Sequence, residues 1–183
     1  MDTPLRPCLH NQRGFVLVYL TLAMVLLMGM AALALDTGHL YVIKAQLQNA
    51  ADAGALAGGA SLDGSASSTQ AAARVAAQTY TGKNSAAGKP VQLELNYGNS
   101  ATGDIVVGCW NAKATPPPLD IDRSCKKPDA IKINARKSAD AGSGPAPVKT
   151  IFARVAGINQ MNVGAVAIAY RPSKQHDTTT LVK

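Results

Sequence analysis

The residue types that most often carry out chemistry are few in this chain and far apart. The 183 residues include three histidines, at His10, His39 and His176. One precedes a long apolar block, one follows its end, and one lies close to the C-terminal end. Such positions do not converge easily on one metal ion, and no spacing of Cys and His matches a zinc site. The sequence therefore predicts no metal centre.

Acidic side chains offer one close pair, Asp120 and Asp122, in a proline-rich loop. Together with Asp104 or Asp129 this pair would form a weak cation site, although a solvated loop is the interpretation we favour. The chain contains no GxxxxGKS or GxxxxGKT phosphate loop, no GxSxG nucleophile elbow and no GxGxxG dinucleotide motif. We therefore expect no catalytic residue, no cofactor and no small-molecule substrate, so the chain is not predicted to be an enzyme.

The three cysteines are placed unequally. Cys8 precedes the apolar block, whereas Cys109 and Cys125 follow it. If the later part of the chain lies in an oxidising compartment, Cys109 and Cys125 can form a disulfide. Closing a loop of about 15 residues would stabilise the fold by roughly 3 kcal/mol. Two free thiols are the alternative.

The net charge is +7 and the isoelectric point is about 9.5. The basic residues are scattered, and examples are Arg74, Lys83, Lys89, Lys113, Arg136 and Lys149. Only Arg123, Lys126 and Lys127 lie close together, in the proline-rich loop. A nucleic-acid groove usually adds aromatic stacking platforms or a recognition motif, and aromatic residues are only 4% here. We expect a solvated basic surface and no nucleic-acid partner.

The apolar block from Phe15 to Leu35 contains no charged residue. Its 21 residues would span roughly 30 Å as a helix, which matches the hydrocarbon core of a bilayer. Arg6 and Arg13 precede the block and Asp36 follows it, so the positive-inside rule places the N-terminus in the cytoplasm. The sequence predicts a single-pass protein of a bacterial inner membrane with its C-terminal domain in the periplasm. Asp36 is expected to be an interfacial boundary charge, or to pair with a cation of a partner subunit.

A cleaved signal peptide is the alternative to an anchor. Ala32-Leu33-Ala34 has the small-x-small form of a signal-peptidase site, and a positive region precedes the apolar block. The apolar run is longer than a usual signal-peptide core, however, and the helical pattern continues after Ala34. We favour the anchor; the alternative is a periplasmic binding or adhesion module released after Ala34.

The helical pattern extends well beyond the apolar block. Positions Leu40, Ile43, Leu47, Ala50, Gly54 and Ala57 recur at spacings of three and four residues. We expect one helix from Phe15 to about Ala60, roughly 65–70 Å long. Gly54 and Gly58 form a small-xxx-small pair, which allows another backbone to approach closely. This surface packs either on the chain's own domain, which we favour, or against a neighbouring subunit.

The remainder of the chain predicts an α+β fold, with a long helix packed on a small, mostly antiparallel sheet of about four strands. A second helix is expected at 68–80, with Ala72, Val75, Ala76 and Tyr80 on its apolar side. Strands are expected at 91–97, 105–110, 130–136 and 162–170, the first two as a hairpin, and a short helix at 148–156. An irregular loop occupies 111–128. The predicted domains are a cytoplasmic segment 1–14, a transmembrane helix 15–35, a periplasmic domain 36–170 and a flexible tail 171–183.

Several of these segments together carry a family resemblance. The N-terminal pattern combines Arg13-Gly14, the apolar span, Asp36, Gly38 and an alanine-rich register through Leu47, Ala51, Asp52, Ala53, Leu56 and Ala57. Gly108-Cys109-Trp110, the segment 130–135 and the sequence FARVAGI at 152–158 follow in order. This pattern resembles the Flp-type tight-adherence (Tad) pilus-assembly proteins of the TadE/TadG-like family. Gly54 departs from it, since alanine is usual at that position.

The resemblance implies a pilin-like, non-catalytic envelope protein of Flp pilus assembly, which supports adhesion. Its expected partners are other Tad/Flp assembly proteins, pilins and the inner membrane. A minor pilin-like, tip or initiation subunit is one role that the resemblance allows. Processed family members usually have a glutamate a few residues into the mature span. Here Tyr19 stands five residues after Gly14, and the span contains no acid. Gly14-Phe15 is therefore only a possible processing site, and we expect an uncut anchor.

Overall fold

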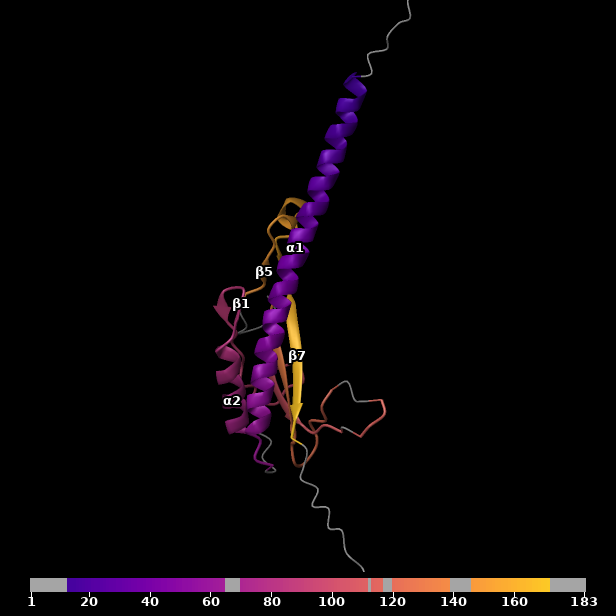
Figure 1. Ribbon diagram of the computed structural model, residues 1–183. Coiled ribbons are helices and arrows are strands. Elements are labelled where there is room, and N and C mark those ends of the chain that lie inside the picture. Colours follow the sequence, from indigo (N-terminus) through magenta and orange to yellow (C-terminus); the bar gives the residue numbers. More distant parts are fainter. Residues whose placement is uncertain (1–12, 65–69, 112, 117–119, 139–145, 172–183) are drawn as a thin grey trace, which may run out of the picture.

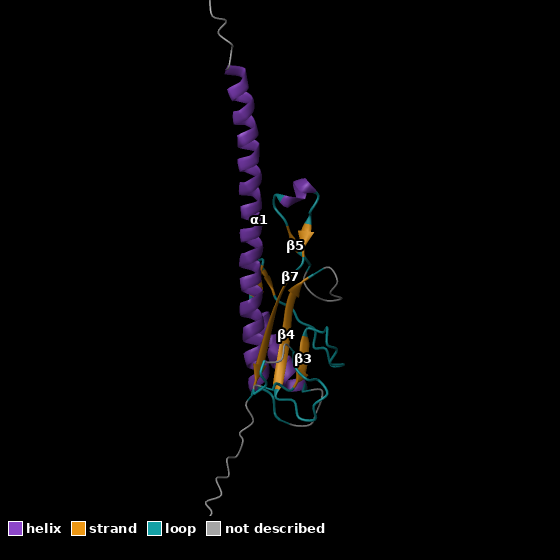
Figure 2. Cartoon of the chain, turned by 90° about the vertical axis from the view of Figure 1, so that its right-hand side faces the viewer, coloured by secondary structure: helices purple, strands orange, loops and turns teal. Residues whose placement is uncertain are grey.

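The computed structural model describes residues 13–64, 70–111, 113–116, 120–138 and 146–171. A single helix, α1 (Arg13–Ala60), runs along almost the whole molecule. The first part of α1 stands alone, and the other elements gather around its second part (Figures 1 and 2). The predicted continuous helix from Phe15 to about Ala60 is confirmed.

The first part of α1 is long and apolar enough to cross a membrane. Its large side chains from Phe15 to Leu35 are all exposed, because no other part of the described chain covers them. The hydroxyl of Thr21 donates to the carbonyl oxygen of Val18, so this polar group is satisfied within the helix. The predicted span, residues 15–35, therefore has the surface that lipid would cover.

The second part of α1 buries the predicted face, with Ile43, Leu47 and Ala50 nearly inaccessible to solvent. Helix α2 (Ala71–Gly82) packs on this part of α1. At Gly58 a Cβ atom would lie 2.7 Å from the side chain of Ile131 and 3.1 Å from the carbonyl oxygen of Ala73. The two glycines of the small-xxx-small pair thus permit close packing within the chain.

The buried face of α2 differs from the prediction. Ala73, Arg74, Ala77 and Thr81 face inward. The larger Val75 and Tyr80, which were expected inside, are exposed. The close approach to α1 leaves room only for small side chains at the contact, so the bulky apolar residues lie on the outer side. The helix begins at Ala71, and Ser68 lies outside the described residues.

Gly54 provides a sharp test of this close packing. A Cβ atom there would overlap the hydroxyl of the buried Thr81 and lie 3.1 Å from the carbonyl oxygen of Ala77. We expect Gly54→Ala to lower the free energy of unfolding by roughly 1–2 kcal/mol, despite the better helix propensity of alanine. Gly38→Ala is the matched control, because nothing lies within 4 Å of a Cβ there. Urea unfolding of the detergent-solubilised protein should show a gain or no change for Gly38→Ala, and equal effects of both would contradict the close contact.

The sheet also packs on the second part of α1. It has the order β3 (Ile105–Gly108), β4 (Ala130–Lys137) and β7 (Val163–Tyr170), with antiparallel pairing throughout. Its helix-facing side contributes Ile105, Val107, Ile131, Ile133, Ala165 and Ala167 to the core. The opposite side carries a second small cluster of Val106, Ala130 and Ile121, with Trp110 and Ile168 against it. The predicted α+β class is confirmed.

The predicted strand at 91–97 does not join the sheet. Its alternation is real, since Val91 and Leu93 are buried, but side chains take the place of a neighbouring strand. Asp104 accepts from the backbone N–H of Glu94, and Gln78 donates to the carbonyl of Leu93. Two short strands precede this segment, β1 (Ser85–Ala86) and β2 (Lys89–Pro90), and they pair with each other.

The predicted helix at 148–156 is also wrong in extent. Only η1 (Ala153–Ala156) is helical, as one 3₁₀ turn. The flanking strands β5 (Val148–Lys149) and β6 (Gln160–Met161) pair with each other and form the base of a hairpin. The backbone N–H groups of Ile151, Phe152 and Ala153 bond to the side chain of Asp36 and not to carbonyls of a preceding helical turn, so no regular helix leads into η1.

Two predicted terminal segments lie almost wholly outside the described residues, namely 1–14 and 171–183. Arg171, the first residue of the predicted tail, is described and bonds to the folded domain. Its backbone N–H donates to the carbonyl of Asp129, and its guanidinium donates to the carbonyl of Leu62.

Candidate functional site

Residues 148–161, which we call the membrane-proximal arm, extend along α1 away from the sheet. Figure 2 shows the arm with η1 at its tip, beside the middle of α1. Asp36 of α1 anchors it, because its carboxylate accepts hydrogen bonds from three consecutive backbone N–H groups of the arm. The donors are Ile151 at 2.8 Å, Phe152 at 3.1 Å and Ala153 at 2.6 Å.

The burial of Asp36 corrects the expectation of an interfacial boundary charge. Only 5% of the residue is exposed. A buried carboxylate is costly unless hydrogen bonds replace its water shell, and here three backbone amides do so. The amides belong to a segment 115 residues further along the chain, so sequence spacing alone gave no sign of the contact.

The arm is braced by its own hydrogen bonds. The backbone N–H groups of Val155, Gly157 and Ile158 donate to carbonyls within the arm, and that of Thr150 donates to Asn159. The hydroxyl of Thr150 donates to the carbonyl of Ile158, and the guanidinium of Arg154 donates to the carbonyl of Thr150. The arm therefore presents a defined surface and not a loose loop.

An apolar groove of about 810 Å³ separates the tip of the arm from α1. Its α1 wall runs from Met28 to Asp36, and its arm wall runs from Phe152 to Ile158. Among the described residues that line the groove, Asp36 alone is charged. Such a lining suits aliphatic chains or apolar side chains and offers no group for acid, base or nucleophilic chemistry.

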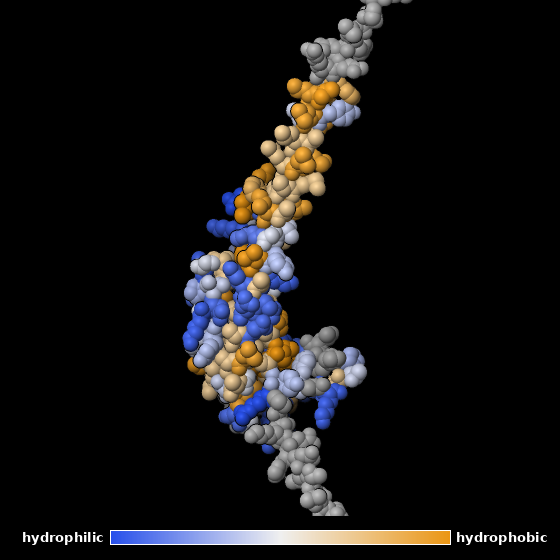
Figure 3. All heavy atoms as spheres, in the orientation of Figure 1, coloured by the Kyte–Doolittle hydropathy of each residue, from blue (hydrophilic) through white to orange (hydrophobic). Residues whose placement is uncertain are grey.

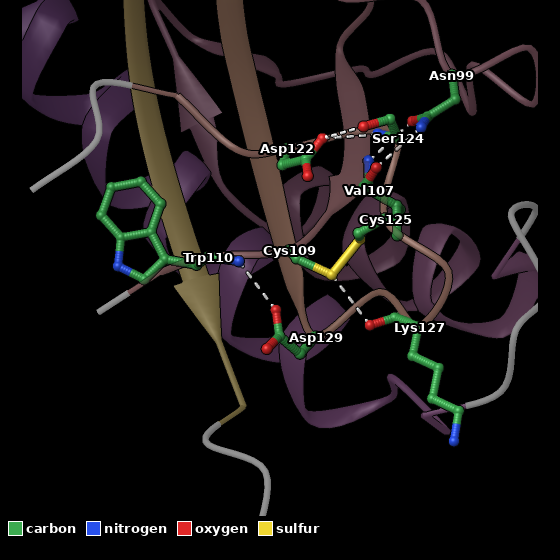
Figure 4. Close-up of a disulfide and its surroundings, with 9 residues drawn as sticks. All are labelled: Asn99, Val107, Cys109, Trp110, Asp122, Ser124, Cys125, Lys127 and Asp129. Atoms are coloured by element: carbon green, nitrogen blue, oxygen red, sulfur yellow. Dashed lines mark hydrogen bonds between the residues drawn. A yellow bond between two sulfur atoms is a disulfide. The ribbon is translucent and has the colours of Figure 1, made fainter. Parts of the chain in front are cut away.

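A second structured region surrounds the disulfide between Cys109 and Cys125 (Figure 4). The backbones of Cys109 and Asp122 exchange hydrogen bonds in both directions, so the 109–125 loop folds back beside β3. The backbone N–H of Trp110 donates to Asp129, and the backbone and hydroxyl of Ser124 donate to Asp122. Gly108 is required here, because a Cβ atom would overlap the carbonyl of Asp122. The loop thereby covers the outer face of the sheet.

The four carboxylates of the possible cation site do not come together. Asp120 pairs with Lys132 at 2.7 Å and Asp104 with Arg136 at 2.9 Å, whereas Asp122 and Asp129 accept from Ser124 and Trp110. Among the described residues no group of three His, Cys, Asp or Glu side chains is placed to hold a metal ion. Partial burial raises the pKa of Asp120, but its bonds to Lys132 outweigh this and hold the pKa below the usual value. Hydrogen bonds from Ser124 lower the pKa of Asp122.

Comparison with protein families decides the wider assignment. A family model described as Flp pilus-assembly TadE/G-like matches residues 14–61, which is most of α1. A second model, described as Tad-like Flp pilus-assembly, matches residues 44–169. The chain belongs to the Tad-like Flp pilus-assembly family. No curated protein and no solved structure matches the chain. The family supports a role in Flp/Tad pilus assembly, together with other pilus components, and α1 fits a membrane anchor.

The assembly residues predicted for this Tad-like protein fall into three groups. Leu47, Ala50, Gly54 and Gly58 are buried against the chain's own domain, and Ala57 is half-buried. Asp36 holds the membrane-proximal arm. Gly14 and Phe15 are exposed at the start of α1, beside the possible processing site.

Arg74 is a structural residue that sequence reasoning missed. It was expected on a solvated basic surface but is fully buried. Its guanidinium donates to the carbonyls of Leu95 and Ile105 and to the side chain of Asn99. Burial lowers the pKa of Arg74 from its usual value. The only signal was its position between Ala73 and Ala77 in a small-residue helix, which the prediction had turned outward.

Asp36 can be tested as the anchor of the membrane-proximal arm. We expect Asp36→Ala to release the arm from α1, because the N–H groups of Ile151, Phe152 and Ala153 lose their acceptor together. Hydrogen exchange of peptides from the arm, measured by mass spectrometry on detergent-solubilised protein, should become much faster. Asp52→Ala is the control, since Asp52 lies on the same helix, is exposed and accepts only from Gln48 among the described contacts. Equal exchange of the arm in both variants would contradict the anchoring role.

Proposed function

We propose that this Tad-like protein is a non-catalytic, membrane-anchored component of Flp pilus assembly. In this proposal residues 15–35 span the inner membrane, and residues 36–170 form a domain in the periplasm. The observation that carries it is the continuity of α1, which leads from an exposed apolar segment directly into the core of the domain. An exposed apolar helix suits lipid, whereas the domain buries its own apolar residues.

The proposed orientation rests on charge. Arg6 and Arg13 precede the span, and Asp36 follows it, so the basic flank belongs in the cytoplasm. A periplasmic domain would also let Cys109 and Cys125 stay oxidised. The two arguments are independent and favour the same topology.

We further propose that the anchor remains uncut and that the protein supports assembly as a minor pilin-like, tip or initiation subunit. Tyr19 occupies the place where processed relatives carry an acid, which supports an uncut anchor. A rigid continuous helix is also what a subunit needs if it packs beside the helices of pilins. In the alternative, cleavage after Ala34 would cut α1 only two residues before Asp36, which anchors the arm.

A deletion strain tests the proposed function. Loss of the gene should abolish Flp pili on the cell surface and the adhesion that depends on them, and the wild-type gene should restore both. Electron microscopy of the cells and a surface-adhesion assay provide the measurements. Normal piliation in the deletion strain would reject the proposed role.

A further inference from the structure

The membrane-proximal arm carries large apolar side chains that nothing in the described chain covers. Val155, at the tip, is 92% exposed. Ile151, Phe152, Ile158 and Met161 are also exposed large apolar residues. Five such residues lie within eleven positions and together form the apolar patch of the arm, and in a soluble domain such a patch marks a surface that something covers.

The position of the arm along α1 indicates what covers it. The groove between arm and helix extends back to Met28, eight residues before Asp36. At 1.5 Å per residue this is about 12 Å along the helix, within the predicted span. The tip of the arm therefore lies beside the outer end of the span. In Figure 3 hydrophobic residues cover the upper part of the molecule, hydrophilic residues first appear beside the lower end of this part, and both kinds occur on the domain below.

We propose that the membrane-proximal arm enters the bilayer interface beside the span, and that lipid acyl chains fill the groove. The apolar patch is continuous with the surface of the span, which lipid already surrounds, so no second protein is needed to cover it. Interfacial elements usually bury their apolar surface about 5–10 Å into the boundary between headgroups and acyl chains. The chain would then contact the membrane through both the span and the arm.

The hydrogen bonds of the arm make this insertion feasible. A non-helical backbone enters a low-dielectric region only if its polar groups are satisfied. Asp36 and the internal bonds of the arm provide acceptors for the N–H groups of Thr150, Ile151, Phe152, Ala153, Val155, Gly157 and Ile158. The buried carboxylate of Asp36 thus satisfies backbone N–H groups of the arm that would otherwise be unpaired in lipid.

The charge on the arm agrees with a shallow insertion. Arg154 is the only charged residue between Thr150 and Met161. Its guanidinium bonds to the carbonyl of Thr150, toward the base of the arm and away from the tip. In that position it can reach lipid phosphates while the apolar residues lie deeper, as long basic side chains do at membrane surfaces.

Tryptophan quenching by brominated lipid tests the proposal. The chain contains a single tryptophan, Trp110, so a Trp110→Phe background leaves one reporter in each variant. Val155→Trp places the reporter on the arm, Leu27→Trp places it in the span, and Val75→Trp places it on the exposed side of α2. Each full chain is reconstituted as one copy per nanodisc of phosphatidylcholine, with or without bromine on the acyl chains. One copy per disc excludes contacts with a second protein.

We expect Val155→Trp to show blue-shifted emission that brominated lipid quenches, as it does for Leu27→Trp, whereas Val75→Trp is not quenched. Quenching of Val155→Trp no stronger than that of Val75→Trp would overturn the proposal. A blue shift without quenching would mean that another part of the same chain covers the arm, and this would also overturn the proposal. Ile158→Trp repeats the measurement from a second exposed position, so the result does not depend on how one variant folds.

Discussion

Replacing Arg74 with methionine is expected to lower the free energy of unfolding by roughly 3–4 kcal/mol, because buried carbonyls lose their donor and each such loss costs about 1–3 kcal/mol. The carbonyls are those of Leu95 and Ile105, and the side chain of Asn99 loses its bond to the guanidinium as well. Methionine keeps most of the apolar stem, so the change isolates the polar contacts. Urea unfolding in detergent, followed by circular dichroism, measures the effect.

Two further variants make the Arg74 result specific. Arg123→Met removes an exposed arginine that donates to the backbone carbonyl of Asn99, and it should change stability by less than about 0.5 kcal/mol. Arg74→Lys keeps the charge but loses the planar fork of donors, so its stability should fall between those of the wild type and Arg74→Met. An Arg74→Met protein as stable as Arg123→Met would contradict the role assigned to the buried guanidinium.

The second large effect is expected from the disulfide between Cys109 and Cys125. Replacing both cysteines with serine should destabilise the domain by about 3 kcal/mol, since the unfolded chain regains the freedom of a loop of this length. The backbone hydrogen bonds between Cys109 and Asp122, and the packing of the small core around Val106, should weaken in the same variant, because the loop covers that face of the sheet.

Reduction provides the control for the disulfide. Adding a reductant to the wild-type protein should lower its urea midpoint to that of the double serine variant, and the same reductant should leave the variant unchanged. A wild-type protein whose midpoint does not respond to reductant, and equals that of the variant, would show that the bond contributes nothing in solution.

The elements that were predicted well from the sequence are those with a local periodic pattern of apolar residues. The helix from Phe15 to Ala60 follows from a proline-free segment with apolar residues at spacings of three and four, and β4 and β7 follow from alternation. The burial of Val91 and Leu93 was predicted by the same alternation, but their hydrogen-bond partners were not. Gln78 donates to the carbonyl of Leu93, Asp104 accepts from the N–H of Glu94, and Arg74 donates to the carbonyl of Leu95. Such contacts between distant side chains and the backbone leave no periodic signal.

The contacts of Asp36 and the orientation of α2 could not be predicted for a related reason. A carboxylate at the end of a span is usually exposed, so its burial depends on the distant arm that bonds to it. On α2 the large apolar side chains lie on the face that was predicted to be buried, yet the face with Ala73 and Ala77 packs on α1. Gly54 and Gly58 bring the two helices so close that large side chains do not fit between them. In both places tertiary contact overrode the local pattern.

The central claim is that this Tad-like protein acts as an uncut, membrane-anchored subunit of Flp pilus assembly. The most direct test is the intact mass of the native protein, taken from membranes, from the soluble periplasm and from sheared surface filaments. We predict a membrane-bound chain whose mass includes the residues before Phe15. A chain that begins just after Ala34 in the soluble periplasm would contradict the anchor, and a chain that begins at Phe15 in the filaments would contradict the uncut state.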